Sequence, residues 1–131
     1  MVIVDTSVWI DFLNGVTNPE SEWLDLNLDR QRIGLTTTVL AEVLQGLRDD
    51  REASLVHAQL VSFEIVELID AALAVEAAHN YRRLRQLGRT VRTTIDVLMA
   101  TYCMREQHAL LHRDRDFDVF EERFGLSVIR P

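Results

Sequence analysis

Segments with the pattern of buried strands alternate with segments of helical pattern along the whole chain, and this alternation constrains the fold more than any other feature. Five short runs rich in β-branched and other apolar residues are predicted strands, at residues 2–4, 33–37, 63–68, 109–111 and 126–129. The segments between them place apolar residues at helical spacing, at 6–13, 19–31, 37–47, 51–61, 70–87, 94–103 and 117–124. Strands joined through helices pair in parallel, so the sequence predicts a three-layer α/β fold, a short and mostly parallel sheet flanked by helices.

The chain is predicted to form one domain over residues 1–131. Its length suits one hydrophobic core, 47% of its residues are apolar, and no linker, repeat or low-complexity stretch divides it. The single cysteine excludes an internal disulfide bond, and the N-terminal residues lack the basic segment of a signal peptide. No apolar run approaches the length of about 18 residues that a membrane span needs. We therefore expect a cytoplasmic protein without a membrane partner.

All 14 basic residues are arginine, and the absence of lysine excludes mechanisms that need one, such as Schiff-base formation or a Walker-type phosphate site. The net charge of −7 argues against simple coating of DNA or of a membrane. The charge is unevenly spread, however, because residues 1–80 hold 4 arginines and 14 acids, whereas residues 81–131 hold 10 arginines and 7 acids. An anionic partner could therefore bind the C-terminal part.

Four acidic residues fall near the carboxyl ends of predicted strands, where a parallel sheet places functional groups. Asp5 directly follows the first strand, and Asp114 lies three residues beyond the strand at 109–111. Glu42 borders the apolar stripe of the helix after the second strand, and Asp96 lies within an apolar run near a helix start. A carboxylate among apolar residues is costly unless it is paired, hydrogen-bonded or bound to a metal, although a first-turn acid such as Asp96 also complements the helix dipole.

These four carboxylates would repel one another if they shared a crevice. Two carboxylates about 4 Å apart repel by roughly 4 kcal/mol at an effective dielectric constant of about 20. The cluster would therefore hold protons or bind a cation. Ligands that are all oxygen atoms favour Mg²⁺ or Mn²⁺ over Zn²⁺, and Mg²⁺ held by a few carboxylates also binds substrate phosphate oxygens. The pattern indicates hydrolysis of phosphodiesters.

Four segments resemble the motifs of PIN-domain ribonucleases, and most closely those of the VapC toxins of bacterial type II toxin–antitoxin pairs. They are the opening strand and helix VIVDTSVWIDFL, the helix TTVLAEVLQGLR, the Thr-x-x-Asp helix VRTTIDVLMATYC, and the acidic motif LLHRDRDFDVF after a strand. Each motif is weak alone, but the four occur in the family's order and spacing across essentially the whole chain. The resemblance implies a PIN-like three-layer sandwich and a metal-dependent endoribonuclease that cleaves single-stranded or loop RNA, for example in tRNA, as the toxin of such a pair.

The resemblance also implies which acids form the metal site with Mg²⁺ or Mn²⁺. By position, the catalytic acids are Asp5, Glu42, Asp96 and Asp114, with Asp116 as a candidate fifth ligand. Asp5 and Asp96 would anchor the ion, whereas Glu42 and Asp114 would orient the attacking water, and one of them would accept its proton. The last ligand remains open between Asp114 and Asp116.

Four neighbouring polar residues are expected to support these acids or to lie outside the site. Thr6 and Ser7 follow the first acid as in the family, where a hydroxyl supports the site. His112 stands where many relatives have threonine and is not expected to be a ligand. Asp118 is expected to face solvent.

Arginines near the acidic motifs are candidate RNA-binding residues. Five lie within residues 82–92, and the last two of these, Arg89 and Arg92, lead toward Asp96. Arg113 and Arg115 flank Asp114. They are predicted to bind RNA phosphates, and a solvated helix face is the alternative for the first group.

Apolar residues of the first two predicted helices are candidates for a partner surface. The resemblance implies a homodimer or a toxin–antitoxin hetero-oligomer in which a VapB-like antitoxin wraps the toxin. The candidates for this contact are Trp9, Phe12, Trp23 and Leu24. Packing in the core is the alternative for all of them.

Two other functions are compatible with a small α/β chain that carries acids at its strand ends. A catalytically inactive PIN-like module would serve only for binding, but the chain keeps all four acids. A phosphoacceptor signalling domain would need a phosphate-sensing lysine on a late strand, and the sequence has none.

Overall fold

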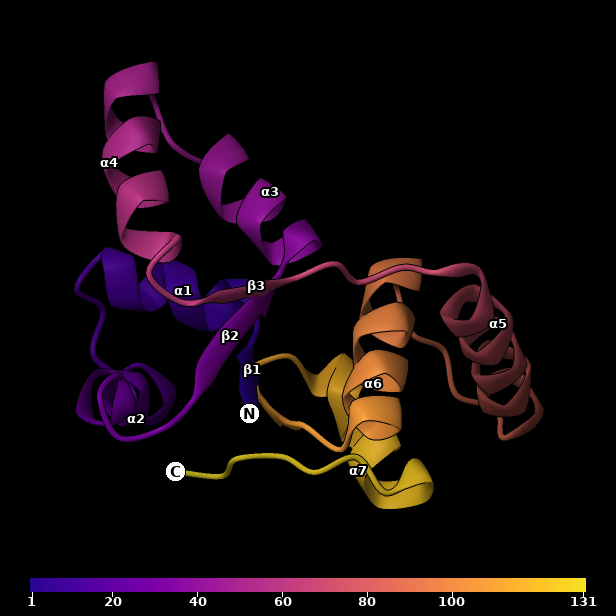
Figure 1. Ribbon diagram of the computed structural model, residues 1–131. Coiled ribbons are helices and arrows are strands. Elements are labelled where there is room, and N and C mark those ends of the chain that lie inside the picture. The colour runs from indigo at the N-terminus through magenta and orange to yellow at the C-terminus, as the bar shows by residue number, and fades with distance from the viewer.

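The computed structural model describes residues 1–131 and contains one four-stranded sheet at its centre (Figure 1). The strands are β1 (Val2–Val4), β2 (Ile33–Thr36), β3 (Glu64–Val66) and β4 (Ala109–Leu111). They lie in the order β3-β2-β1-β4, and each neighbouring pair is parallel. This confirms the predicted α/β class and places the first strand at the centre of the sheet.

Seven α-helices and one 3₁₀ turn surround the sheet. They are α1 (Thr6–Leu13), α2 (Pro19–Asn27), α3 (Thr37–Gln45), α4 (Asp50–Leu60), α5 (Ala71–Gln86), α6 (Thr94–Glu106), η1 (Arg115–Phe117) and α7 (Asp118–Phe124). In Figure 1, α1 and α2 lie on one side of the sheet and α5, α6 and α7 on the other, while α3 and α4 extend from one end. The arrangement has the expected three layers. No helix has the length and apolar character needed to cross a membrane.

Capping side chains set the starts of several helices. Asp70 accepts a hydrogen bond from the Leu73 N–H at 2.7 Å, and Thr93 accepts one from the Asp96 N–H at 3.2 Å. Both satisfy backbone donors in the first turn that have no partner within the helix. The sequence predicts caps at Asp70 and at Thr93 or Thr94, and the structure has them at Asp70 and Thr93. For α1 the sequence predicts a cap at Thr6 or Ser7, but the cap position belongs to Asp5, whose side chain makes no capping bond.

Two predicted elements differ from the structure. The helix expected over residues 19–31 ends at Asn27, whose side-chain amide donates to the Trp23 carbonyl oxygen at 2.7 Å, one of the local side-chain bonds that compete with helix continuation. The strand expected over 126–129 is wrong, because that segment makes only one isolated bridge, between Leu110 and Val128. The segment lies beside β4 but makes only two backbone hydrogen bonds with it, both at Leu110, so it has the composition of a strand without a continuous ladder.

The core lies on both sides of the sheet and includes two residues that were candidates for a partner surface. Trp9 and Leu24 have no solvent exposure, so neither side chain can contact another molecule directly. This corrects the expectation for these two residues. Phe12 and Trp23 are partly buried against the core and keep exposed surface.

Candidate active site

The carboxyl ends of β1 and β4 bring Asp5 and Asp114 to one edge of the sheet. The Asp5 N–H donates to the Leu111 carbonyl oxygen at 3.0 Å, which joins the two strand ends directly. Asp114 lies three residues further along and begins η1 by accepting a hydrogen bond from the Asp116 N–H at 2.9 Å. The parallel pairing of two strands that are far apart in the sequence therefore creates this edge.

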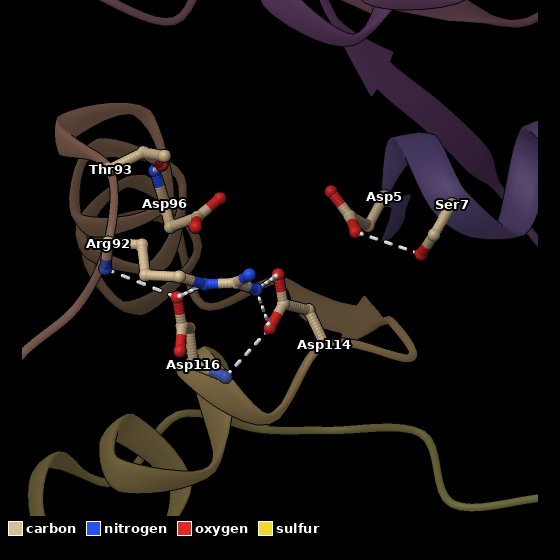
Figure 2. Close-up of polar contacts among 7 residues, drawn as sticks. All are labelled: Asp5, Ser7, Arg92, Thr93, Asp96, Asp114 and Asp116. Carbon is tan, nitrogen blue, oxygen red and sulfur yellow. Dashed lines mark hydrogen bonds and ion pairs between the residues drawn. The ribbon is translucent and has the colours of Figure 1, made fainter.

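Three carboxylates converge beside this edge (Figure 2). Asp96, Asp114 and Asp116 each offer a carboxylate oxygen, and these three oxygens lie within 4.8 Å of one another. Asp96 comes from the first turn of α6, where Thr93 holds its backbone. We call these three residues the carboxylate triad. Its donor atoms are all oxygens, which is the ligand chemistry that Mg²⁺ and Mn²⁺ prefer.

Asp5 and Glu42 line the same cavity but do not belong to the triad. The cavity has a volume of about 440 Å³, and Asp5, Glu42, Asp96 and Asp114 all contribute to its wall. Figure 2 shows the Asp5 carboxylate facing Asp96 from the opposite wall. The Ser7 hydroxyl donates to Asp5 Oδ2 at 3.2 Å, and Thr6 lines the cavity beside it. The structure thus gathers the four predicted acids around one cavity. It brings two of them, Asp96 and Asp114, together with Asp116 close enough to bind one ion.

The electrostatics of the cavity favour a cation. Burial, together with the negative charges of Asp96 and Glu42, raises the pKa of Asp5 to about 6, although hydrogen bonds from Thr6 and Ser7 act in the opposite direction. Burial also raises the pKa of Asp96, and the nearby carboxylates of Asp114 and Asp116 act in the same direction. A divalent cation would relieve both effects, because it stabilises the ionised form of every carboxylate around it.

Arg92 makes the only bonds between a basic side chain and the triad. Its Nε donates to Asp116 Oδ2 at 3.0 Å, and its Nη2 donates to the two oxygens of Asp114 at 3.2 and 3.3 Å. Its backbone N–H also donates to Asp116 Oδ2, at 3.2 Å. The bond to Asp116 raises the pKa of the Arg92 guanidinium, so the side chain stays charged. The sequence indicated that Arg92 lies near Asp96 but gave no sign of this contact.

Comparisons with known proteins agree with the fold. The model of the PIN domain family matches residues 2–122. The chain belongs to the PIN domain family. It is 30% identical to the VapC ribonuclease Mb1587 of Mycobacterium bovis and to ribonuclease VapC11 of Mycobacterium tuberculosis, over 98% of this chain and 97% of each relative.

Solved structures share this PIN fold over nearly their whole length. The VapBC2 complex of Rickettsia felis, bound to a DNA fragment from its promoter, contains a chain with a TM-score of 0.75 and 20% identity, and 98% of each chain is covered. The toxin VapC20 of Mycobacterium tuberculosis, described as cleaving the sarcin–ricin loop, gives a TM-score of 0.70 and 19% identity over 100% of both chains.

The other arginines predicted to bind RNA have different surroundings in this PIN domain. Arg113 forms ion pairs with Asp11 at 2.5 Å and with Glu20 at 3.5 Å, which ties the start of the acidic loop to α1 and α2. Arg89 lies 3.7 Å from Glu122. Arg115 is exposed and has no ion pair, so its charge is fully available to a ligand.

Two further residues of the last acidic motif lie outside the triad. Asp118 pairs with Arg130 at 3.0 Å rather than standing free in solvent. His112 is 3% exposed, neither of its ring nitrogens has a hydrogen-bond partner, and burial lowers its pKa. Its ring packs against Phe117 with the centroids 4.9 Å apart, so it belongs to the core below the loop.

Replacing Asp5 with asparagine is expected to stabilise the metal-free PIN domain at neutral pH. The folded-state pKa of about 6 lies above the ordinary value of 3.8, so the folded state loses stability as pH rises from about 4 to 6. Ionising Asp5 in the folded state costs wild type about 3 kcal/mol of stability, and asparagine avoids this cost. The variant also loses hydrogen bonds to the carboxylate, so we expect its free energy of unfolding to rise by about 1–2 kcal/mol.

Urea unfolding in EDTA at pH 4 and pH 7.5 measures this difference. The variant should exceed wild type in stability at pH 7.5 and lose most of that advantage at pH 4, where Asp5 is protonated in the folded state and close to its ordinary pKa of 3.8 in the unfolded state. Asp29→Asn, at an exposed position without an ion pair, is the control and should change stability at neither pH. Equal stability of Asp5→Asn and wild type at pH 7.5 would contradict the high pKa of Asp5.

Proposed function

We propose that this PIN domain is a metal-dependent endoribonuclease that acts as the toxin of a toxin–antitoxin pair. The observation that carries the proposal is the carboxylate triad, which lies at the carboxyl edge of a parallel sheet beside exposed arginines. Relatives that match over nearly the whole chain bear the name VapC ribonuclease, which supports RNA as the substrate class. The oxygen-only donor set supports Mg²⁺ or Mn²⁺ as the cation.

The triad residues Asp96, Asp114 and Asp116 are proposed to hold the cation, because their oxygens already lie within ligand distance of one another. When bound, the cation would supply positive charge that neutralises the phosphate and makes water a stronger nucleophile. Thr93 holds the backbone of Asp96, and the Asp116 N–H holds the carboxylate of Asp114. These bonds orient two of the three carboxylates before any ligand arrives.

Asp5 is proposed to accept the proton of the attacking water. Its carboxylate faces the triad across the cavity, and with a pKa of about 6 before a cation binds it is mostly ionised at neutral pH, as a proton acceptor must be. Ser7 fixes one of its oxygens and leaves the other directed into the cavity. Glu42, on the wall formed by α3, is proposed to orient the same water.

RNA is proposed to cross the face that carries Arg92 and Arg115. Both arginines line a cavity of about 590 Å³ that also contains Ser7 and Asp114, so it continues from the site cavity. The lining of this cavity has three arginines against two acids, so its charge is locally positive although the net charge of the chain is −7. Arg89 and Arg113 are proposed to bind RNA more weakly than Arg115, because each already has an acidic partner and Arg115 has none.

A VapB-like antitoxin and a second toxin chain are the proposed protein partners. Chains that share the fold occur in VapBC complexes, one of them bound to a DNA fragment from its promoter. For the antitoxin contact, the structure supports Phe12 and Trp23, which keep exposed surface. A groove of about 370 Å³ between α1, α3 and α4 is a second candidate surface and has Ile10, Leu13, Val43 and Leu47 in its lining. Burial of such apolar surface is the usual source of affinity in protein interfaces.

RNA cleavage by the isolated protein is expected to depend fully on a divalent cation. Protein depleted of metal by EDTA should leave RNA intact, and added Mg²⁺ or Mn²⁺ should restore cleavage, because the triad cannot neutralise a phosphate without a cation. Mapping the new RNA ends after induced expression identifies the target. Cleavage that persists in excess EDTA would contradict the proposal, and binding of RNA without cleavage in Mg²⁺ and Mn²⁺ would favour an inactive binding module.

A further inference from the structure

The bonds of Arg92 occupy the oxygens that a cation would need on Asp114. Asp114 Oδ1 accepts from both the Asp116 N–H and Arg92, and Oδ2 accepts from Arg92. Asp116 Oδ2 accepts twice from Arg92, through the side chain and the backbone. Asp96 accepts no hydrogen bond from an arginine, so the guanidinium covers one side of the triad and leaves the other side open.

We propose that Arg92 is a tethered cation that holds the triad in the metal-free protein, leaves Asp114 when a divalent cation binds, and then binds an RNA phosphate. The inference rests on the proposed function, since it assumes a cation and RNA at this site. It adds a coupling between the two ligands: cation binding frees a positive side chain that RNA then uses. The coupling is reciprocal, so bound RNA also strengthens cation binding.

The surroundings of Arg92 allow the guanidinium to move at little cost. Its side chain is 75% exposed, and ion pairs in such positions contribute little to stability. The backbone N–H of Arg92 bonds to Asp116 independently of the side chain, so the loop before α6 remains attached when the guanidinium leaves. A dication beside a guanidinium experiences strong repulsion, which favours the released state.

The released guanidinium would remain next to the face proposed for RNA. Arg92 lines both the site cavity and the cavity that contains Arg115 and Arg113, so a rotation of its side chain carries the charge from one to the other. Arg115 is the matched control for every measurement. It lies in the same region and has the same charge, but it bonds to no carboxylate of the triad.

Mn²⁺ affinity, measured by isothermal titration calorimetry, tests the competition. Arg92→Met is expected to bind Mn²⁺ about tenfold more tightly than wild type, because the competing charge next to the ion is removed. Arg115→Met should change the affinity by about twofold or less, through long-range charge alone. Equal effects of the two substitutions, weaker binding by Arg92→Met, or no Mn²⁺ binding by either wild type or Arg92→Met would overturn the inference.

RNA affinity, measured by fluorescence anisotropy with a labelled single-stranded RNA oligonucleotide, tests the coupling. In EDTA, Arg92→Met should bind RNA as wild type does, because the guanidinium is already paired with acids. In Mn²⁺, with the oligonucleotide checked on a gel for intactness, the same variant should bind about three- to tenfold more weakly than wild type. Arg115→Met should weaken binding to the same extent in both conditions.

An equal loss of RNA affinity by Arg92→Met with and without Mn²⁺ would overturn the inference. The proposed function fails on a different result, which is RNA cleavage that persists in EDTA. The affinities of Arg92→Met and Arg115→Met therefore distinguish a failure of the coupling from a failure of the nuclease assignment.

Discussion

Replacing Asp96 with asparagine is expected to lower the rate of RNA cleavage roughly a thousandfold, with the fold unchanged. Asp96 belongs to the triad and also faces Asp5 across the cavity, so it lies beside both the proposed cation site and the proposed proton acceptor. Asparagine keeps the shape of the side chain and the backbone bond to Thr93, but it removes the negative charge that a cation requires. The measurement is the initial rate of cleavage of a defined RNA in Mg²⁺.

Asp118→Asn is the matched control for this prediction. Asp118 follows Asp114 and Asp116 in the same acidic run, but its carboxylate pairs with Arg130 on the other side of the loop. Its replacement should leave cleavage within about twofold of wild type, since exposed ion pairs contribute little. A folded Asp96→Asn protein that cleaved RNA at the wild-type rate would contradict the assignment of Asp96 to the site.

The same substitution should not destabilise the metal-free protein. Burial and the negative charges of Asp114 and Asp116 raise the pKa of Asp96, so the ionised carboxylate is unfavourable in the folded state. Circular dichroism and thermal unfolding of Asp96→Asn in EDTA should therefore match wild type or show a small gain. A loss of activity with retained stability separates a role in chemistry from a role in folding.

Local patterns in the sequence were sufficient to predict the strand ends and the acids that follow them. Asp5 ends a run of three β-branched residues, and Asp114 follows a short apolar run, so each could be placed at the edge of a parallel sheet from neighbouring residues alone. The Thr93 cap also follows from a local pattern, since a threonine three residues before an acid is typical of a helix start.

Contacts between distant segments could not be predicted in this way. The bonds from Arg92 to Asp114 and Asp116 join residues 22 and 24 positions apart, and they depend on how the loop before α6 meets η1. The sequence also could not show whether Asp114 or Asp116 is the last ligand. In the folded chain, where η1 forms, both carboxylates lie close to that of Asp96. The spacing of acids along a loop does not determine which of their carboxylates lie close together in the fold.

The sequence also did not show which apolar residues of α1 and α2 are fully buried. Trp9 and Phe12 lie three residues apart and therefore on neighbouring parts of one helix face. Only the packing of α1 against the rest of the fold decides that Trp9 is fully buried and Phe12 partly exposed. A sequence pattern identifies an apolar face, but it does not distinguish its centre from its margin.

Replacing Trp9 with alanine is expected to lower the free energy of unfolding by about 3–5 kcal/mol, because it leaves a large cavity in the core. The indole has no solvent exposure and packs against Phe12 and Phe63, with ring centroids 6.1 and 5.1 Å away. Stabilities of whole domains are only about 5–15 kcal/mol, so the variant should unfold at a much lower urea concentration. Urea unfolding followed by circular dichroism gives the difference.

Trp9→Phe distinguishes this explanation from a direct role in partner binding. The indole N–H is buried without a hydrogen-bond partner, so phenylalanine keeps an aromatic ring in the core and removes a polar group that burial penalises. We therefore expect Trp9→Phe to retain most of the stability that Trp9→Ala loses. If Trp9→Ala left the isolated protein as stable as wild type, the indole would not support the core, and a contact with a partner would again be the better explanation for its presence on α1.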